Sequence, residues 1–467
     1  MAPTDDSATI DTALAKLDAR RVGYTTYRNY YSGAHPPLVA PDKTRSAFGA
    51  FYDPGPDNLC AAVVDALVER LELTGFSVEG RATEGKPEVD RPRDAGDDAW
   101  DLWNANRMDL RAGEVHLGAV RDGDAYVIVW DDPRRPGTPV IHPNPADLVT
   151  VVYDDEMPGR IVVAVKRWTR KDGKTRVNVY YPDRIEKYVS RTTTAPARLS
   201  LYERAEDDVL NPYGVVPVFH FANNAPIGMF GVSELVNAIP SQRRLNKTLA
   251  DLDIAREIVA LVQRWVSGVE IPIDPLTGKP ADLKLAWERL LIMADPQARA
   301  GTMQGADLSS FFRAIDDARL SIARNTGTPL HYMLLQNDPP SGKALQTLEA
   351  RFVKKCRARQ TAFGNTWEDA MALALLIAGR GDDTIRLSAQ WANPAPTDAK
   401  AEAETAEIKA RIGVPREQLL KELGYTDKQI ATWQAQTGRR GRGDAAGLLA
   451  ALEEQERARR LVDEVLP

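Results

Sequence analysis

Residues 327–378 read GTPLHYMLLQNDPPSGKALQTLEARFVKKCRARQTAFGNTWEDAMALALLIA. A proline-bounded loop leads directly into segment 342–378, whose apolar residues recur every three or four positions, and this spacing predicts one long amphipathic helix. At 1.5 Å per residue, a helix of about 36 residues spans roughly 54 Å. That length exceeds the core of an ordinary compact domain, so we expect the helix to be a strut in something larger.

The composition excludes several classes of protein. The chain has 467 residues, of which 43% are hydrophobic and 27% charged, and its formal net charge is −6. These values are typical of soluble globular proteins and give no overall basic field for nucleic acid. The two cysteines, Cys60 and Cys356, lack paired spacing, so neither a disulfide scaffold nor a zinc site is expected. The acidic N-terminus does not resemble a signal peptide, and the longest apolar run, 371–378, is too short to span a membrane.

The N-terminal half changes its hydrophobic period once. Helical spacing predicts helices at 8–32, after Asn58 and at about 98–121. From 125 to 221 the period becomes two, which predicts a mostly antiparallel sheet with strands at 125–130, 160–168, 175–181, 184–189 and 216–221. Asp172-Gly173 predicts a type I′ hairpin turn between the second and third of these strands.

Helical spacing returns in the C-terminal half. A helix is expected from Val232 to about Val266, with Gly268 as its end and a kink or break near Pro240. The expected packing face of this helix consists of Leu245, Leu249, Leu252, Val259 and Val262. A further helix is predicted at about 306–326, a strand at 384–391, and charged helices beyond Pro396. The fold class that these elements predict is α+β.

The sequence carries no recognisable catalytic signature. Ser341-Gly342-Lys343 fails as a phosphate-binding loop, because that motif needs a glycine where Asn337 stands and a serine or threonine where Ala344 stands. Asp154-Asp155-Glu156 could bind a divalent cation, but acidic runs in a predicted turn are normally solvated. The histidines are scattered, and one inside a predicted strand, such as His220, is more often packed than catalytic. We therefore expect no enzymatic activity, no cofactor and no metal.

Five stretches stand out along the chain: YRNYYSGAH at 27–35, NLCAAVVDALVERLELTGF at 58–76, GVSELVNAIPSQRRLNKTLADLDIAREIVALVQRWVSG at 231–268, the helical segment from Ser341, and QWANPAPTDAKAEAE at 390–404. In these stretches and in the order of its elements, the chain resembles the portal proteins of long-tailed (siphovirus-type) double-stranded DNA bacteriophages. None of these stretches is a catalytic signature. Their order along nearly the whole chain is the stronger observation.

The resemblance implies a plan for the chain. Residues 1–231 would be a wing of helices plus an antiparallel β insertion, 232–268 a first stem helix, 269–305 a small clip and 306–326 a second stem helix. Residues 327–341 would be the tunnel loop, 342–396 the long wing helix and a strand, and 397–467 a helical crown. Within the loop, the residues expected to line the DNA channel are His331, Tyr332, Met333, Leu334, Gln336 and Asn337. For Met333, Leu334 and Leu335, packing against a neighbouring loop is an equal alternative.

The resemblance also implies a role and partners. The chain would form a homo-oligomeric ring, dodecameric in the family, at the capsid vertex of the virion, after assembly in the host cytoplasm. Double-stranded DNA would pass through this head-tail connector during genome packaging and ejection. The implied partners are the terminase large subunit, the head-tail adaptor, and the major capsid and scaffolding proteins, with no membrane. The alternatives are a non-viral helical scaffold or adaptor protein and a nucleotide-handling enzyme.

A strip of basic residues on the predicted long helix has two possible interpretations. Segment 342–378 carries a basic strip consisting of Arg351, Lys354, Lys355, Arg357 and Arg359. The strip is either a second packing face, as a subunit that repeats around an axis needs, or an ordinary solvated helix face. A channel for DNA should avoid gripping the phosphates, because each neutralised phosphate adds salt-dependent affinity.

Overall fold

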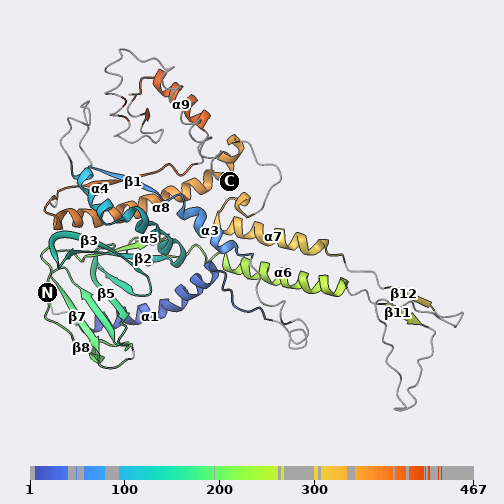
Figure 1. Ribbon diagram of the computed structural model, residues 1–467, viewed down its shortest axis with the longest axis horizontal. Helices are drawn as coiled ribbons and strands as arrows, with labels where there is room; N and C mark the ends of the chain where they lie inside the picture. Colours follow the sequence, from blue (N-terminus) through green and yellow to red (C-terminus); the bar gives the residue numbers. More distant parts are fainter. Residues whose placement is uncertain are drawn as a thin grey trace. The chain divides into compact units, whose positions relative to one another are not determined.

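The computed structural model (Figure 1) describes residues 6–39, 49, 57–78, 94–193, 195–260, 264–267, 299–302, 307–333, 342–381, 384–395, 399–414, 416, 419–420, 430 and 433. The chain divides into two compact units. Unit 1 contains residues 1–34, 59–239 and 323–467, and unit 2 contains residues 35–58 and 240–322. Each unit is described by itself below.

Unit 1 combines helices with antiparallel sheets, as expected for the α+β class. Its helices are α1 (Asp6–Tyr31), α3 (Leu59–Val68), α4 (Ala95–Ala105), α5 (Met108–Asp122), the short η3 (Leu199–Leu201) and η4 (Leu330–Tyr332), α8 (Gly342–Ile377) and α9 (Ala399–Arg411). Its strands are β1 (Leu73–Val78), β2 (Asp124–Asp132), β3 (Arg135–Pro145), β4 (Val149–Tyr153), β5 (Ile161–Thr169), β6 (Thr175–Tyr180), β7 (Arg184–Ser190), β8 (Tyr202–Arg204), β9 (Val209–Leu210), β10 (Val218–Ala222) and β13 (Leu387–Trp391).

The strands of unit 1 form three antiparallel groups. One sheet has the order β10-β2-β3, a larger one has the order β4-β5-β6-β7-β8 with β9 paired to β7, and β1 pairs with β13 across more than 300 positions of sequence. Helix α8 packs against β13 and against β10, β2 and β3, while α5 packs against β2 and β3. The three-stranded sheet therefore lies against both α5 and α8 (Figure 1).

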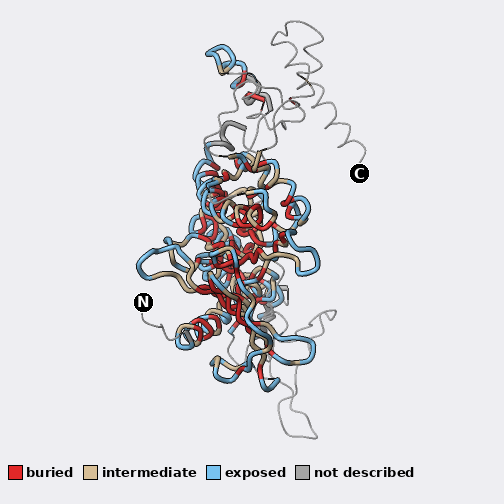
Figure 2. Tube along the Cα trace, turned by 90° about the vertical axis from the view of Figure 1, so that its left-hand side faces the viewer, coloured by how far each residue is buried: buried red, intermediate tan, exposed pale blue. Residues whose placement is uncertain are grey.

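The core of unit 1 has two apolar clusters that α1 helps to form. Ile10 and Leu14 pack against Val165 and Val177 of the larger sheet. Further along α1, Tyr24 joins a cluster that includes residues of β2, β4 and β10. Figure 2 shows buried residues gathered between the helices and sheets, with exposed residues on the outer turns. Helix α1 therefore stabilises both sheets by burying apolar surface.

The central predictions for unit 1 are confirmed. Helix α8 runs from Gly342 to Ile377, so Gly342-Lys343 lies at a helix start, as expected from the failed phosphate-loop match. The five strands expected between 125 and 221 correspond to β2, β5, β6, β7 and β10. The turn between β5 and β6 is present, but the predicted type I′ geometry is wrong. Only Gly173 has a positive φ (78°), and its N–H bonds to the carbonyl of Arg170 (3.0 Å), as in a type I turn followed by a left-handed glycine.

Two predictions for unit 1 need correction. The single helix expected at 98–121 is two helices, α4 and α5, because Arg107 between them adopts the left-handed conformation (φ 54°). Strand β3 was not predicted, since its sequence contains Pro136, Pro139, Pro143 and Pro145. Proline cannot donate to a β ladder, but β3 is an edge strand of its sheet and tolerates the missing N–H groups.

Unit 2 is built on α6 (Ile239–Ala260) and α7 (Ser309–Thr326), whose last residues belong to unit 1, together with the paired strands β11 (Arg264–Ser267) and β12 (Arg299–Thr302). The helix predicted at 232–266 is therefore too long at both ends. It begins at Ile239 because Pro240 is tolerated only in a first turn. It ends before β11, whose backbone groups pair with β12 instead.

The packing face predicted for α6 is partly described. Leu245 and Leu252 are buried, Leu249 and Val259 are half-buried, and Val262 lies outside the described residues. Polar side chains also hold unit 2 together. Gln242 Nε2 donates to Asn246 Oδ1 (2.8 Å) and to the Asp57 carbonyl (2.7 Å), and Arg319 of α7 pairs with the Asp57 carboxylate (3.0 Å). Asp57 thus links α6 with α7.

Several predicted features fall outside the described residues. They include most of the expected clip (269–305), the loop tip at 334–341 and most of the segment beyond 414. Among the helices that the structure describes, none has the length and hydropathy of a membrane span. Helix α9 is the described part of the expected C-terminal helices.

Candidate functional site

The candidate site is the root of the loop that precedes α8. After α7 ends at Thr326, Gly327 adopts a left-handed conformation (φ 69°), and Pro329 leads into the short helix η4. Lys355 of α8 donates its Nζ to the carbonyl of Thr326 (2.8 Å). This contact satisfies an orphan carbonyl at the end of α7 and ties the beginning of the loop to α8.

A buried carboxylate, Glu349 of α8, holds the residues of η4. The Tyr332 hydroxyl donates to Glu349 Oε1 (3.1 Å), and His331 Nε2 lies 3.0 Å from the same oxygen. Only 2% of the Glu349 side chain is exposed, so the charge depends on these partners for stabilisation. Residues just before the loop tip are thereby fixed on the second turn of the long helix.

Arg70, which follows α3, completes this network. Its guanidinium donates to Glu349 Oε2 (3.0 Å), to the Tyr332 hydroxyl (2.6 Å) and to the carbonyl of Pro394. Burial alone would lower the pKa of Arg70, but Tyr332 and Glu349 outweigh burial and raise it. Burial is also the main cause of the raised pKa of Tyr332. Arg70 therefore stays charged, and Tyr332 stays a neutral hydrogen-bond donor at ordinary pH.

The structure describes three of the six residues predicted to line a channel. His331 and Tyr332 are half-buried and belong to the Glu349 network, while Met333 is buried. The rings of His331 and Tyr332 lie 4.5 Å apart, and Tyr332 also meets Phe352 edge-on. Leu334, Gln336 and Asn337 lie outside the described residues.

The predicted basic strip of α8 divides into two faces. Lys355 and Arg359 point inward and pair with Glu234 at 2.7 and 2.8 Å. Burial opposes the ionised form of Glu234, but these two cations outweigh it and lower the pKa of the carboxyl. Arg359 Nε also donates to Asn223 (2.9 Å). The remaining cations of the strip, Arg351, Lys354 and Arg357, are exposed.

A second buried carboxylate, Asp124 at the start of β2, organises the middle of unit 1. It accepts from Arg20 (2.5 Å), from the Tyr24 hydroxyl (2.7 Å) and from the backbone N–H of Gly231 (2.6 Å). His220 Nε2 lies 2.8 Å from Asp124, and its Nδ1 lies 2.7 Å from the Tyr153 hydroxyl. His220 is thus packed into a network of structural contacts, as its place in a strand predicted. Burial opposes ionisation of Asp124, but the contacts with His220 and Arg20 lower its pKa.

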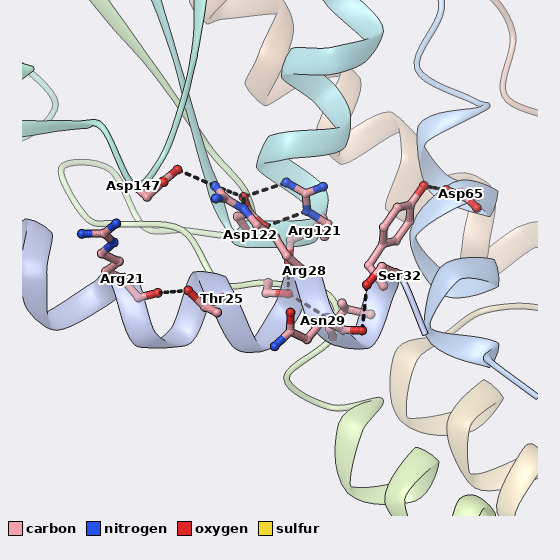
Figure 3. A network of polar contacts seen from close by, with 12 residues as sticks. Arg21, Thr25, Arg28, Asn29, Ser32, Asp65, Arg121, Asp122 and Asp147 are labelled. Atoms are coloured by element: carbon pink, nitrogen blue, oxygen red, sulfur yellow. Dashed lines mark hydrogen bonds and ion pairs between the residues drawn. The ribbon is translucent and has the colours of Figure 1, made fainter. Parts of the chain in front are cut away.

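The C-terminal half of α1 is clamped to the rest of unit 1 by a third network (Figure 3). Arg28 bonds to Asp122 at the end of α5 (2.9 Å) and to Asp147 between β3 and β4 (2.7 Å). Asp122 also accepts from Arg121, and Tyr31 donates to Asp65 of α3 (2.8 Å). These contacts join the stretches 27–35 and 58–76, which the sequence singled out separately.

The described residues support neither a metal site nor a nucleotide site. No group of three or more His, Cys, Asp or Glu among the described residues could hold a metal ion. Asp154 instead accepts from the backbone N–H groups of Glu156 (2.9 Å) and Met157 (3.2 Å), which is an ordinary turn. In the described residues the site is a junction at which the loop root, α8 and Arg70, just after α3, meet at one buried carboxylate.

Sequence reasoning missed the residues that hold the loop. Arg70 and Glu349 are 279 positions apart, so no local spacing connects them. The available signal was Glu349 itself, an acid at a position that the helical period places toward the apolar side of α8, near Phe352.

The family model and the curated relatives that the chain matches are all portal proteins. Residues 62–442 match the family model described as phage portal protein, SPP1 Gp6-like. The chain is 27% identical over 412 residues to the portal protein of Mycobacterium phage D29, and 26% identical over 412 residues to that of Mycobacterium phage L5. Each alignment covers 81% of this chain and 79% of the relative.

Solved structures give weaker likenesses. A chain of the virion of the native gene transfer agent particle is 14% identical, with a TM-score of 0.44, covering 87% of this chain and 99% of that chain. A chain from the neck of the native particle, computed with C12 symmetry, is 15% identical, with a TM-score of 0.44, covering 84% of this chain and 96% of that chain. Both TM-scores lie below 0.5.

Proposed function

Because the chain belongs to the family of SPP1 Gp6-like phage portal proteins, we propose that copies of it close into a ring through which double-stranded DNA enters and leaves the capsid. The chain is a structural portal protein of a virion and not an enzyme. The ring is dodecameric in this proposal. It stands at one capsid vertex after assembly in the host cytoplasm, and it binds the terminase large subunit during packaging and the head-tail adaptor afterwards.

The plan of the subunit follows the same proposal. Residues 1–231 and 342–396 form the wing, 232–268 and 306–326 the stem, 269–305 the clip and 397–467 the crown. Residues 327–341 form the tunnel loop, and the residues that line the narrowest part of the channel are His331, Tyr332, Met333, Leu334, Gln336 and Asn337. The stem packs through Leu245, Leu249, Leu252, Val259 and Val262. Capsid and scaffolding proteins contact the outside of the ring.

One observation about the geometry supports this function best. A loop that narrows around moving DNA must resist being pulled along with it, so its root needs a rigid support. The root of the 327–341 loop is tied to α8 through Glu349 and to the end of α3 through Arg70. Charge-assisted hydrogen bonds of this kind are roughly twice as strong as neutral ones. The loop root is therefore firmly supported on α8 and on the segment that follows α3.

The test is the mass and shape of the purified full-length chain. We expect light scattering to give one mass that is a large multiple of the 51.5 kDa subunit, and negative-stain images to show rings with a central hole. A chain that stays monomeric or dimeric at every concentration, also when co-expressed with its capsid and scaffolding proteins, would contradict the proposal.

A further inference from the structure

The exposed side of α8 carries an uncompensated row of cations. Arg351, Lys354 and Arg357 follow one another at intervals of three residues, so they lie on one side of the helix, and all three are exposed. Within the part of the chain that the structure describes, none of the three has an ion pair. Like charges so spaced repel one another, which costs the isolated helix a little stability.

This row continues into an apolar and then a small-residue surface. One turn before Arg351 stands Leu348, whose side chain is 61% exposed. After Arg357 the next exposed positions are Ala358, Thr361 and Ala362, which leave room for another backbone to approach, and Asn365 and Asp369 follow them. An exposed leucine gains nothing from contact with phosphates, and small residues favour close helix packing. The surface, which we call the α8 face (Leu348, Arg351, Lys354 and Arg357), therefore suits a protein partner better than DNA.

A complementary surface occurs elsewhere in unit 1. Leu110 of α5 is 72% exposed, and the acids Asp109 and Glu114 flank it on exposed positions of the same helix. Neither acid has an ion pair within the described residues, and a side chain at Gly113 between them would meet nothing within 4 Å. We call Asp109, Leu110 and Glu114 the α5 face. Arg107, three residues before Leu110, adds one positive charge at the edge of the α5 face.

The two faces are opposite in charge and similar in apolar content and length. At 1.5 Å per residue, the α8 cations span about 9 Å and the α5 acids about 7.5 Å. Asp109 lies in the first turn of α5, where an acid is favourable in any case, but Glu114 has no such local reason. Because the two faces lie on different helices of one chain, a contact between them can repeat head to tail from copy to copy, and such contacts form a ring when the rotation between copies closes.

We propose that the α8 face of one subunit binds the α5 face of the next copy of this chain. The proposed contact rests on the ring proposed above and names one of its subunit interfaces. It brings an exposed leucine from each side into the contact and neutralises charges that are otherwise unpaired. Like charges brought together across the same contact would oppose assembly strongly.

Charge reversal tests the contact. The double variant Arg351→Glu/Lys354→Glu and the double variant Asp109→Lys/Glu114→Lys should each raise the concentration for half-assembly by about tenfold or more, since 1.4 kcal/mol is a factor of ten. An equimolar mixture of the two variants should restore rings, because each subunit then meets a complementary neighbour on both sides. Mass photometry of the full-length chains measures all three samples. The matched control is Lys171→Glu/Lys174→Glu, a double reversal in the β5–β6 turn, which should assemble like the original chain.

The possible outcomes are distinct. Rings from both variants, with unchanged half-assembly, would overturn the α8–α5 contact while the proposed function stands. Rings from Arg351→Glu/Lys354→Glu that fail to package DNA would also overturn it, and would assign the α8 face to DNA instead. Loss of rings that the mixture does not restore counts against the contact when circular dichroism shows both variants folded. If the original chain itself forms no ring under any condition, the proposed function fails first.

Discussion

The Asp124 and Glu349 networks are each built from a carboxylate, an arginine, a tyrosine and a histidine. They differ in the further contacts that the carboxylate and the histidine make. In each network, an arginine donates to the buried carboxylate and to a tyrosine hydroxyl. The tyrosine hydroxyl donates in turn to the carboxylate, and a histidine Nε2 lies within hydrogen-bond distance of it. Asp124 also accepts a backbone N–H, and the second nitrogen of its histidine meets Tyr153. Around Glu349, the His331 side chain is 20% exposed, and its second nitrogen has no hydrogen bond among the described residues.

The difference separates two uses of a buried charge. The Asp124 network joins α1, β2 and β10, which are elements of the core, and satisfies nearly every polar atom in it. The Glu349 network joins a loop root to α8 and leaves the second nitrogen of His331 without a hydrogen bond among the described residues. Exposure alone does not separate the two networks, since the Arg20 side chain beside Asp124 is 32% exposed. A closed network contributes chiefly to the stability of the fold, whereas an open network at the base of a loop contributes to the position of that loop. Variants of the two carboxylates should therefore behave differently.

The largest effect is expected from Asp124→Asn. Removing this charge leaves Arg20 partly buried without its partner and puts an amide next to the Gly231 N–H, so the free energy of unfolding should fall by about 3–5 kcal/mol. Urea unfolding, followed by circular dichroism, measures the change. Asp155→Asn, in an exposed turn, is the matched control and should change stability by less than about 0.5 kcal/mol. A loss below 1 kcal/mol for Asp124→Asn would refute the closed-network interpretation.

The second prediction concerns the stability of the fold at acidic pH. It involves His116, a buried histidine that belongs to neither network. His116 of α5 is buried, accepts from Trp367 Nε1 (2.9 Å) and stacks on Phe363; burial lowers its pKa to about 4. In the unfolded chain the His116 imidazole binds a proton near pH 6.5, whereas in the folded chain it binds that proton only near pH 4. Stability should therefore fall as the pH decreases through this window, by roughly 3 kcal/mol.

The control for this pH dependence is His116→Gln, which can still accept from Trp367 but does not titrate. Between pH 6.5 and 4 its unfolding free energy should decline much less than that of the original chain, and the decline that remains includes the contribution of His142, whose pKa burial also lowers. Below about pH 4 the lowered pKa of Asp124 and Glu234 should cause a further loss, because these carboxylates contribute stability only while ionised. In the Asp124→Asn background that last loss should shrink. An equally steep decline between pH 6.5 and 4 in His116→Gln would assign the titration to another group.

Much of the fold could be predicted from the sequence because it follows from local periodicity. Helix α8 has an unbroken apolar stripe and no proline, and β5 and β6 alternate around an Asp-Gly turn, so both were expected nearly to the residue. The errors arose where tertiary contacts override local signals. Strand β3 pairs through an edge despite its prolines, and the helix expected to reach Val266 gives way to a strand because β12 supplies a partner.

The candidate site was predictable only in part, for a related reason. The loop and its position before α8 follow from the proline and glycine pattern and from the family resemblance. Its support does not, since Arg70, Tyr332 and Glu349 come from three separate segments. The division of the basic strip was equally hidden, because Lys355 and Arg359 are distinguished from their neighbours only by the presence of Glu234. Buried polar networks of this kind are specified by the completed fold rather than by spacing.

The smallest change in stability, and the sharpest distinction between the two networks, is expected from Glu349→Gln. Glutamine keeps an acceptor for Tyr332 but removes the charge that Arg70 meets, so the free energy of unfolding should fall by about 1.5–3 kcal/mol. Glu368→Gln on the same helix is the matched control, because glutamine can still accept from the Ala389 N–H, and it should be near neutral. If the Glu349 network positions the loop root, Glu349→Gln should reduce DNA packaging in a complementation assay more than Asp124→Asn does per kcal/mol of lost stability. Packaging that tracks stability alone in both variants would show that the two networks do the same job, and that the open edge beside His331 has no mechanical consequence.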